Sequence, residues 1–299
     1  MMRTPLLLLM ALFFFASCTK KETITDINHI NQIIDENIAP PYDGVTSVEV
    51  DNYVNKVYID LYGREPLDSE LEFSTAMLKD GGLTPEVREL FLDDIQSSAE
   101  YFTRFWEIYN QAYLQNVTED YINFQIILYT QAYNDELQNG NTAFAQRIMQ
   151  EIIRFEKLRD APADYENGLI DIKEFFRRIA DNGVYDEINM GSENFVISCF
   201  EHFFKRFPTE AELPAAVTMV DGFAAQILLE DGNNKADFLD IILSNGEFYQ
   251  GLVFDIYQQL LSRIPDSAEM GESTLELTEF GSYQSIQRKL MISEDYAGF

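Results

Sequence analysis

The sequence is poor in the residues that build most catalytic and metal sites. Its 299 residues include two cysteines, two histidines and one tryptophan. Two isolated histidines, His29 and His202, with one cysteine in the body of the chain, Cys199, do not supply the usual zinc ligands. A Ser-His-Asp triad would need His202, which no Gly-x-Ser-x-Gly turn accompanies, and no Gly-rich phosphate loop is present. We therefore expect no catalytic residue, no metal and no cofactor.

Basic residues are also scarce. Twenty-one Lys and Arg stand against 51 Asp and Glu, which gives a formal net charge of −30. Such a surface repels nucleic acid and anionic lipid headgroups. We expect no nucleic-acid partner, and we interpret the charge mainly as a solvated surface that keeps the protein soluble.

Long apolar runs are missing after the first seventeen residues. Arg3 precedes an apolar run over 6–15 that is too short to span a bilayer, which is typical of a signal peptide. The small residues directly before Cys18 resemble the lipobox of bacterial lipoproteins. The sequence thus predicts a signal peptide over 1–17 and an acylated N-terminal Cys18; the alternative is an ordinary signal peptide with an incidental cysteine.

Two or more acyl chains on Cys18 would hold the protein on a membrane face rather than across it. Thr19, where an Asp could stand, is compatible with the outer membrane, while Lys20-Lys21-Glu22 lacks an acidic export cluster. The periplasmic and cell-surface faces both remain open. Residues 18–50 are expected to be a flexible tether, because Pro40-Pro41 breaks helices.

One phrase, Arg-x-Pro-x-x-x-Glu-[Leu/Met], occurs three times without gaps, each time after apolar residues at helical spacing. This pattern predicts a helix, a turn at the Arg, and a second helix after the Pro. The residues of the motif are Arg64, Pro66 and Glu70; Arg206, Pro208 and Glu212; and Arg263, Pro265 and Glu269.

The sequence therefore predicts an all-α fold of three divergent helix-turn-helix-loop-helix repeats, of a size typical of stacked units. The repeats are expected over 51–102, 194–249 and 250–299, with an inserted helical segment over 103–193. The third helix of each repeat is expected to end at the related phrases 98–101, 244–248 and 293–296.

The insertion is expected to hold helices over about 103–115, 118–138 and 141–159, closed by Ala161-Pro162. Aromatic and aliphatic residues recur along the first two at helical spacing, which usually marks a core face rather than a ligand platform. The residues expected in the core are Phe102, Phe105, Trp106, Tyr109 and Tyr113, then Tyr121, Phe124, Ile127 and Leu128.

The three arginines admit two interpretations. Each could clamp an anion, or each could pair with the Glu of its own motif or with helix C-terminal carbonyls and brace the corner. Three identical occurrences favour bracing, because a catalytic Arg would be expected once.

The phrase Tyr58-x-x-Leu61-Tyr62-Gly63-Arg64-x-Pro66, with Ser98-x-Glu100-Tyr101 further on, resembles bacterial helical repeats of the Leu-Gly-Arg-x-Pro type and, distantly, phycobilisome-linker repeats. Such repeats occur in envelope and extracellular proteins and beside cytochrome-like modules. The resemblance implies a helical fold and names no activity. The Cys-x-x-Cys-His sites of haem-carrying members are absent here, so it implies no redox function.

Carboxylates are dense enough for chance pairs, and the acidic loop 230–237 has calcium-binding residue types without EF-hand order. We expect a non-catalytic, lipid-anchored scaffold or interaction subunit of the bacterial outer membrane, bound to another envelope protein. The alternative is a polysaccharide-active or glycan-binding lipoprotein, whose cleft would combine two carboxylates with Tyr or Trp106.

Overall fold

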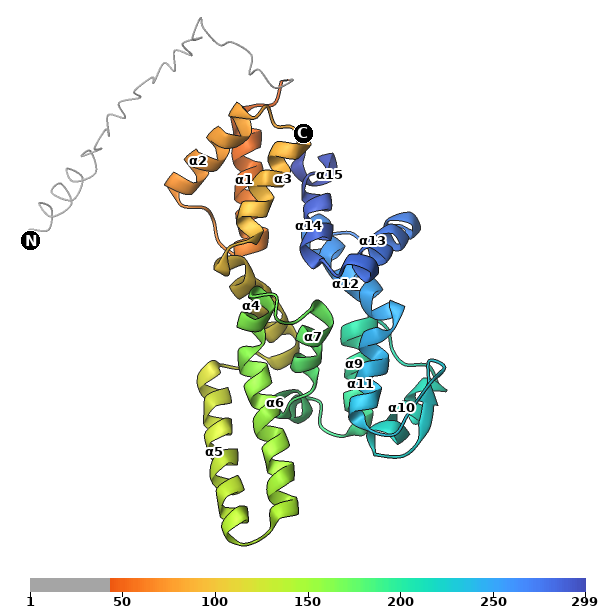
Figure 1. Ribbon diagram of the computed structural model, residues 1–299. Helices are drawn as coiled ribbons and strands as arrows, with labels where there is room; N and C mark the ends of the chain where they lie inside the picture. Colours follow the sequence, from red (N-terminus) through yellow and green to blue (C-terminus); the bar gives the residue numbers. More distant parts are fainter. Residues whose placement is uncertain (1–43) are drawn as a thin grey trace, which may run out of the picture. The chain divides into compact units, whose positions relative to one another are not determined.

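The computed structural model describes residues 44–299 (Figure 1). The predicted signal peptide, Cys18 and most of the predicted tether lie outside these residues. The described part is helical apart from one short hairpin, so the predicted all-α class is confirmed. No helix within it combines the length and the apolarity needed to cross a membrane.

The first half of the described chain contains eight helices: α1 (Ser47–Tyr62), α2 (Asp68–Asp80), α3 (Pro85–Gln96), α4 (Ala99–Leu114), α5 (Glu119–Gln138), α6 (Thr142–Glu166), α7 (Ile172–Ala180) and α8 (Gly183–Ile188). The second half contains α9 (Ser192–Cys199), the π-helical turn η1 (Phe200–Phe204), α10 (Glu212–Val220), the antiparallel strands β1 (Ala225–Ile227) and β2 (Glu230–Gly232), α11 (Lys235–Ser244), α12 (Gly246–Leu261), α13 (Ser267–Phe280), α14 (Tyr283–Met291) and α15 (Glu294–Ala297).

The tether was predicted to reach residue 50, and this boundary is wrong. Thr46 accepts a hydrogen bond from the Glu49 amide, and the Glu49 carboxylate accepts from the Thr46 amide. This reciprocal capping satisfies two amides that a helix start would otherwise leave free. Helix α1 therefore begins at Ser47, within the predicted tether.

The phrases expected to end the third helices instead begin new ones. Ser98 caps α4 and Asn245 caps α12 through side-chain hydrogen bonds, and Ser293 precedes α15. Ser and Asn favour the N-cap position because their side chains accept from the free amides of the first turn. The predicted boundaries at 102/103 and 249/250 consequently fall inside α4 and α12, and the boundary at 193/194 falls inside α9. Each of α4 and α12 thus follows one Arg-x-Pro corner and leads to the next turn.

Pro162 does not close the segment as expected, because it lies within α6, which continues to Glu166. Proline removes one backbone hydrogen bond and disturbs the preceding turn. Arg178 of α7 contacts the helix on either side of Pro162: its guanidinium donates to the Lys157 carbonyl and to the Asp164 carboxylate. These contacts hold α7 against the part of α6 that contains the proline.

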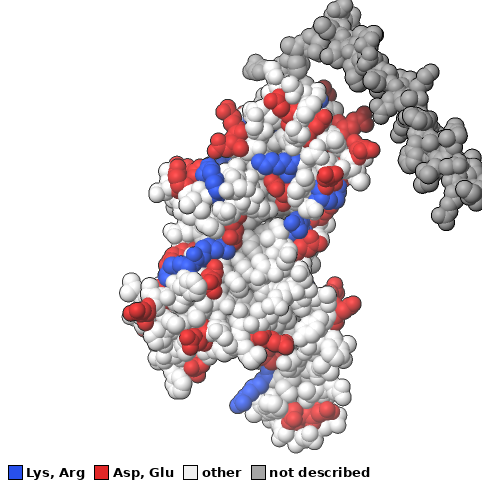
Figure 2. Space-filling view, turned by 180° about the vertical axis from the view of Figure 1, so that it is seen from behind, with Lys and Arg blue, Asp and Glu red and all other residues white. Residues whose placement is uncertain are grey.

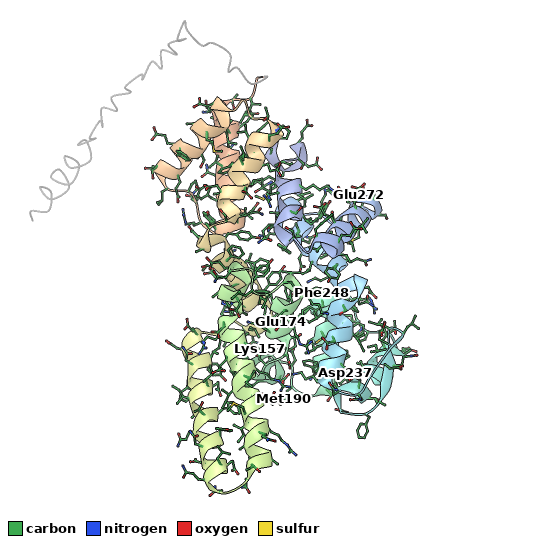
Figure 3. The ribbon with its side chains drawn as sticks, viewed as in Figure 1. Lys157, Glu174, Met190, Asp237, Phe248 and Glu272 are labelled. Atoms are coloured by element: carbon green, nitrogen blue, oxygen red, sulfur yellow. The ribbon has the colours of Figure 1, made fainter. Side chains whose placement is uncertain are left out.

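Aromatic rings from four elements meet in the centre of the core. The Phe176 ring of α7 lies edge-on to Tyr109 of α4, Phe203 of η1 and Phe248 of α12, with ring centroids 4.6, 6.1 and 5.7 Å away. Figure 3 labels Phe248 at the start of α12. Such edge contacts add to the free energy of apolar burial, so they join the middle of the chain to its last third.

Buried polar groups connect α14 to α3 and α4, which lie far away in the sequence. The Tyr101 hydroxyl donates to the Gln287 amide oxygen at 2.7 Å, and the Gln96 amide donates to the same oxygen at 3.2 Å. The hydroxyls of Tyr109 and Tyr283 lie 3.1 Å apart. Because unpaired buried polar groups cost free energy, these bonds favour one register of α14 on α3 and α4.

The π-helical turn η1 presses its backbone against α12. A Cβ added at Gly251 would lie 2.0 Å from the carbonyl oxygen of Phe203. Only glycine allows η1 and α12 to approach this closely. In contrast, nothing lies within 4 Å of a Cβ added at Gly271, which is an exposed interior position of α13.

These two glycines form a matched pair for a stability test. Gly251→Ala should lower the free energy of unfolding by about 1–3 kcal/mol, because α12 must move away from η1. Gly271→Ala should raise it by about 0.5–1 kcal/mol, because alanine is the better helix former. Urea denaturation followed by circular dichroism measures both. Stabilisation by both substitutions would contradict the close contact of η1 with α12.

Candidate functional sites

The three arginines each lie at a helix corner with two carboxylates. Arg64 donates to Glu70 at 2.7 and 2.9 Å, and to Glu100 at 2.5 and 2.9 Å. Glu70 also accepts from the amide of Leu67, at the start of α2. One guanidinium therefore ties the end of α1 to the starts of α2 and α4. The pairing with Glu70 is the one that the bracing interpretation expects.

The second corner repeats this geometry. Arg206 donates to Glu212 at 2.8 and 2.9 Å and to Glu247 at 2.5 and 2.9 Å. At the third corner Arg263 donates twice to Glu269 at 2.7 Å, but only once to Asp295, at 3.3 Å. The third corner is thus the weakest of the three.

Aromatic rings complete each corner. The guanidinium carbon lies 5.5 Å from the Tyr58 ring centre at the first corner, 5.1 Å from Phe200 at the second and 5.3 Å from Tyr257 at the third. These distances are typical of cation–π contacts. Two carboxylates and a ring thus contact each guanidinium, although Arg64, Arg206 and Arg263 keep 33, 32 and 39 % of their side chains exposed. None of the three lines any of five cavities found along residues 44–299.

The second carboxylate at each corner was not predicted to pair with the arginine. These carboxylates belong to Glu100, Glu247 and Asp295, which occupy the same place in the three related phrases. Each lies in the first turn of a helix, where a negative charge is favoured. The shared spacing was the available signal. Sequence alone did not show that these phrases begin helices.

Pairing with arginine shifts the acid titration of the corners. Arg206 lowers the pKa of Glu212 to about 2 from 4.5, mainly through its hydrogen bonds. Because the folded pKa lies below the unfolded one, the stabilising contribution is complete above about pH 4.5 and is lost as the pH falls toward 2. Arg64 lowers the pKa of Glu70 in the same direction.

The unequal corners give a direct comparison. Arg206→Met should lower the free energy of unfolding by about 1–2 kcal/mol, because it leaves two partly buried carboxylates without their charged donor. Arg263→Met should lower the free energy of unfolding clearly less, since the second carboxylate at this corner, Asp295, is exposed and makes one long contact with the arginine. Urea titrations at neutral pH measure the difference. Equal losses would mean that the second carboxylate contributes nothing.

A fourth corner lacks both charges. Gln115 follows α4 in the left-handed conformation that Lys205 and Ser262 adopt before their arginines. Asn116 then stands in the place of the Arg. Further on, Asn182 caps α8 as Ser98 caps α4, and Val184 stands in the place of Glu100. Loss of the cation together with its carboxylate is what a bracing pair predicts, because either charge alone would be unpaired.

His202 lies beside a groove between α4 and α12. Its Nδ1 lies 2.8 Å from the Tyr185 hydroxyl, and its ring stacks on Tyr113 with centroids 4.3 Å apart. Lys205 pairs with the Asp255 carboxylate at 2.6 Å and donates to the Tyr113 hydroxyl at 3.3 Å. Tyr113, Lys205 and Asp255 line a cavity of about 570 Å³.

The groove shows no free catalytic pair. Burial, with a smaller contribution from Lys205, lowers the pKa of His202 to about 4, so the ring is neutral at pH 7. Burial raises the pKa of Asp255, whose carboxylate pairs with no cation other than Lys205 within residues 44–299. Cys199 is buried, and burial raises its thiol pKa to about 12, which makes it unreactive.

His202 should make folding sensitive to mild acid. Its folded pKa of about 4 lies below the ordinary value of 6.5, so the folded state binds fewer protons between these limits and loses stability as the pH falls through them. Between pH 7.5 and 5 the wild type should lose roughly 1–2 kcal/mol that His202→Gln does not lose. Urea titrations at both pH values test this. An unchanged difference between the two proteins would show that the imidazole is solvated.

The glycan alternative needs two carboxylates and an aromatic ring in one cleft. The α4–α12 cavity offers Tyr109 and Tyr113 but one carboxylate. Asp51, Asp68, Glu72 and Asp80 line a cavity of about 520 Å³ beside α1 and α2, without an aromatic ring. Trp106 is half-buried and lies edge-on to Phe175. Among five cavities along the described chain, none combines the two features.

The acidic loop 230–237 is part of the local fold. It contains β2 and the cap of α11, where Asn234 accepts from the Asp237 amide. The Asp237 carboxylate accepts from the Asn233 amide at 2.8 Å. Over residues 44–299, no group of three or more His, Cys, Asp or Glu side chains is placed to hold a metal ion.

The expectation of a core is right for most of α4 and wrong for α5. Phe105, Tyr109 and Tyr113 are buried, whereas Phe124 is 54 % exposed and Ile127 is 64 % exposed. Tyr121 and Leu128 are exposed as well. The reason is that α5 packs on α6 through its other side, where Ile122 is buried and Tyr129 contacts Phe155. In Figure 3, side chains along the far side of α5 face no other helix.

A cavity of about 600 Å³ lies at the N-terminal end of this uncovered face. Its lining includes the apolar side chains of Val117, Val184 and Ile188, and also Tyr121 and Glu187, whose side chains are joined by a 3.4 Å hydrogen bond. Tyr121 belongs both to the cavity and to the exposed side of α5. The two features are therefore continuous, which makes this surface the candidate binding site.

Comparison with known proteins adds no relative: no family model, no curated protein and no solved structure matches this chain. The candidate sites consequently depend on the geometry alone.

Proposed function

We propose that this protein is a non-catalytic interaction subunit of the bacterial outer membrane, anchored through acylated Cys18. The observation that carries the proposal is the uncovered apolar side of α5. Soluble proteins seldom expose a contiguous group of large apolar side chains unless a partner covers it. Tyr121, Phe124, Ile127 and Leu128 form such a group on two adjoining helical turns.

The remaining groups support a passive role. The three arginines are held by paired carboxylates, His202 is neutral and stacked, and Cys199 is buried. Figure 2 shows carboxylates spread over one face of the molecule, many with a Lys or Arg beside them. The lipid anchor would fix the position, residues before α1 would give reach, and the α5 side would hold a second envelope protein.

Photocrosslinking tests this function in the envelope of the producing cells. A benzophenone side chain at position 124 or 127 should form one discrete adduct with another protein. The matched control is position 73 on α2, where an exposed Phe stands outside the α5 surface. Adducts at 73 but none at 124 or 127 would contradict the proposal.

Fractionation of the same cells into membranes and soluble material tests the anchor. The wild-type chain should sediment with membranes and be extracted by detergent, whereas Cys18→Ser should leave it in the soluble fraction, because the thiol that carries the lipid is gone. An unchanged distribution would show that Cys18 is not the anchor, without affecting the crosslinking result.

A further inference from the structure

The chemistry of the partner can be inferred from the charges on α5. Residues 121–134 contain no charged side chain, although 24 % of the whole sequence is charged. Interface centres are typically depleted of charge and enriched in aromatic residues. One side of the stretch packs on α6, and its exposed side is suited to contact with a partner rather than to solvation.

A carboxylate lies at each end of this stretch, on the exposed side of the helix. Asp120 lies four residues before Phe124, and Asp135 lies seven residues after Leu128, so all four share one side of the helix. Both aspartates are exposed. Fifteen residues of helix separate them by roughly 22 Å. Helix α5 carries no Lys or Arg at all.

A second copy of the chain does not fit this side. In an antiparallel pairing Asp120 would face Asp135 of the other copy, and in a parallel pairing each aspartate would face itself. Either register places like charges together, which is unfavourable. A lipid surface fits no better, because helices that lie in a membrane interface carry Lys or Arg on their polar side.

The charge pattern favours a helix of opposite sign. We infer that α5 binds an apolar helix side of a partner protein, bounded at both ends by Lys or Arg about 15 residues apart, with one large apolar side chain in the cavity beside Tyr121. This inference rests on the proposed function and specifies the partner. The cations pair with Asp120 and Asp135, and the anchor side chain contacts Val117, Val184 and Ile188.

The test uses a synthetic amphipathic helix of about 22 residues, with a leucine and phenylalanine stripe between two lysines on the same side. Fluorescence anisotropy with the full mature protein at about 0.15 M salt measures its affinity. Three comparison peptides have glutamates in place of the lysines, the same composition in scrambled order, or alanine in place of the phenylalanine.

The designed peptide should bind, and the glutamate and scrambled peptides should bind at least about tenfold more weakly. Removing its phenylalanine should weaken it by a similar factor. The protein variant F124S/I127S/L128S, which keeps every charge, should weaken it about tenfold. The matched control F73S/F280S changes two exposed apolar residues elsewhere and should bind like the wild type.

A second variant protects the test against altered folding. D120K/D135K leaves the apolar side intact and should reverse the preference, so that the glutamate peptide binds better than the lysine peptide. Circular dichroism and the urea midpoint verify that each variant is folded. If this variant still bound the lysine peptide better than the glutamate peptide, the two aspartates would not select the partner by its charge.

Other outcomes overturn the inference. One is equal binding of the lysine peptide to the wild type and to F124S/I127S/L128S. Another is a wild-type dimer in sedimentation that this variant does not form. The third is binding to phosphatidylethanolamine–phosphatidylglycerol vesicles through the same residues. A crosslink at position 124 to a protein with no basic-bounded helix would overturn the partner chemistry and leave the interaction function standing. Absence of any crosslink at 124 and 127 would overturn both.

Discussion

The structure depends on arginines that each bind two carboxylates from different helices. At each complete corner one guanidinium holds two carboxylates that begin two different helices, and an aromatic ring of the preceding helix contacts its face. Bidentate arginine–carboxylate bonds specify direction as well as distance. The angle between consecutive helices is thereby set by a few bonds at the corner, and the apolar sides of the helices can meet in one core.

The chain continues differently after the corner that lacks this arginine. After Gln115 and Asn116 the chain continues into the long α5–α6 hairpin instead of a short second helix. Without a guanidinium to bind the next helix start, α5 is held by α6 and by its own cap at Thr118. One side of α5 therefore remains uncovered, and the candidate binding site lies where the bracing is absent.

The helical class, the corners and the arginine–glutamate pairs follow from the sequence because they depend on local spacing. The second carboxylates could not be assigned, since Ser98-x-Glu100 is equally compatible with the end or the start of a helix until its neighbours are placed. Periodicity likewise shows that Phe124 and Leu128 share a side of α5, but both sides of α5 are apolar. Only the packing of α6 decides which side is buried, so the exposed site could not be found from the sequence.

Two of the acidic residues have a more specific role in the proposed interaction than keeping the protein soluble. Most carboxylates along the corners have a cation within the fold, whereas Asp120 and Asp135 make no ion pair within residues 44–299. Placed at the two ends of an uncharged stripe, they oppose the contact that an exposed apolar side most readily forms, which is with another copy of itself. In the proposed interaction, the charges that oppose self-association also require a partner to bring cations at a matching separation, so that affinity would arise from the apolar side chains and selectivity from the two aspartates.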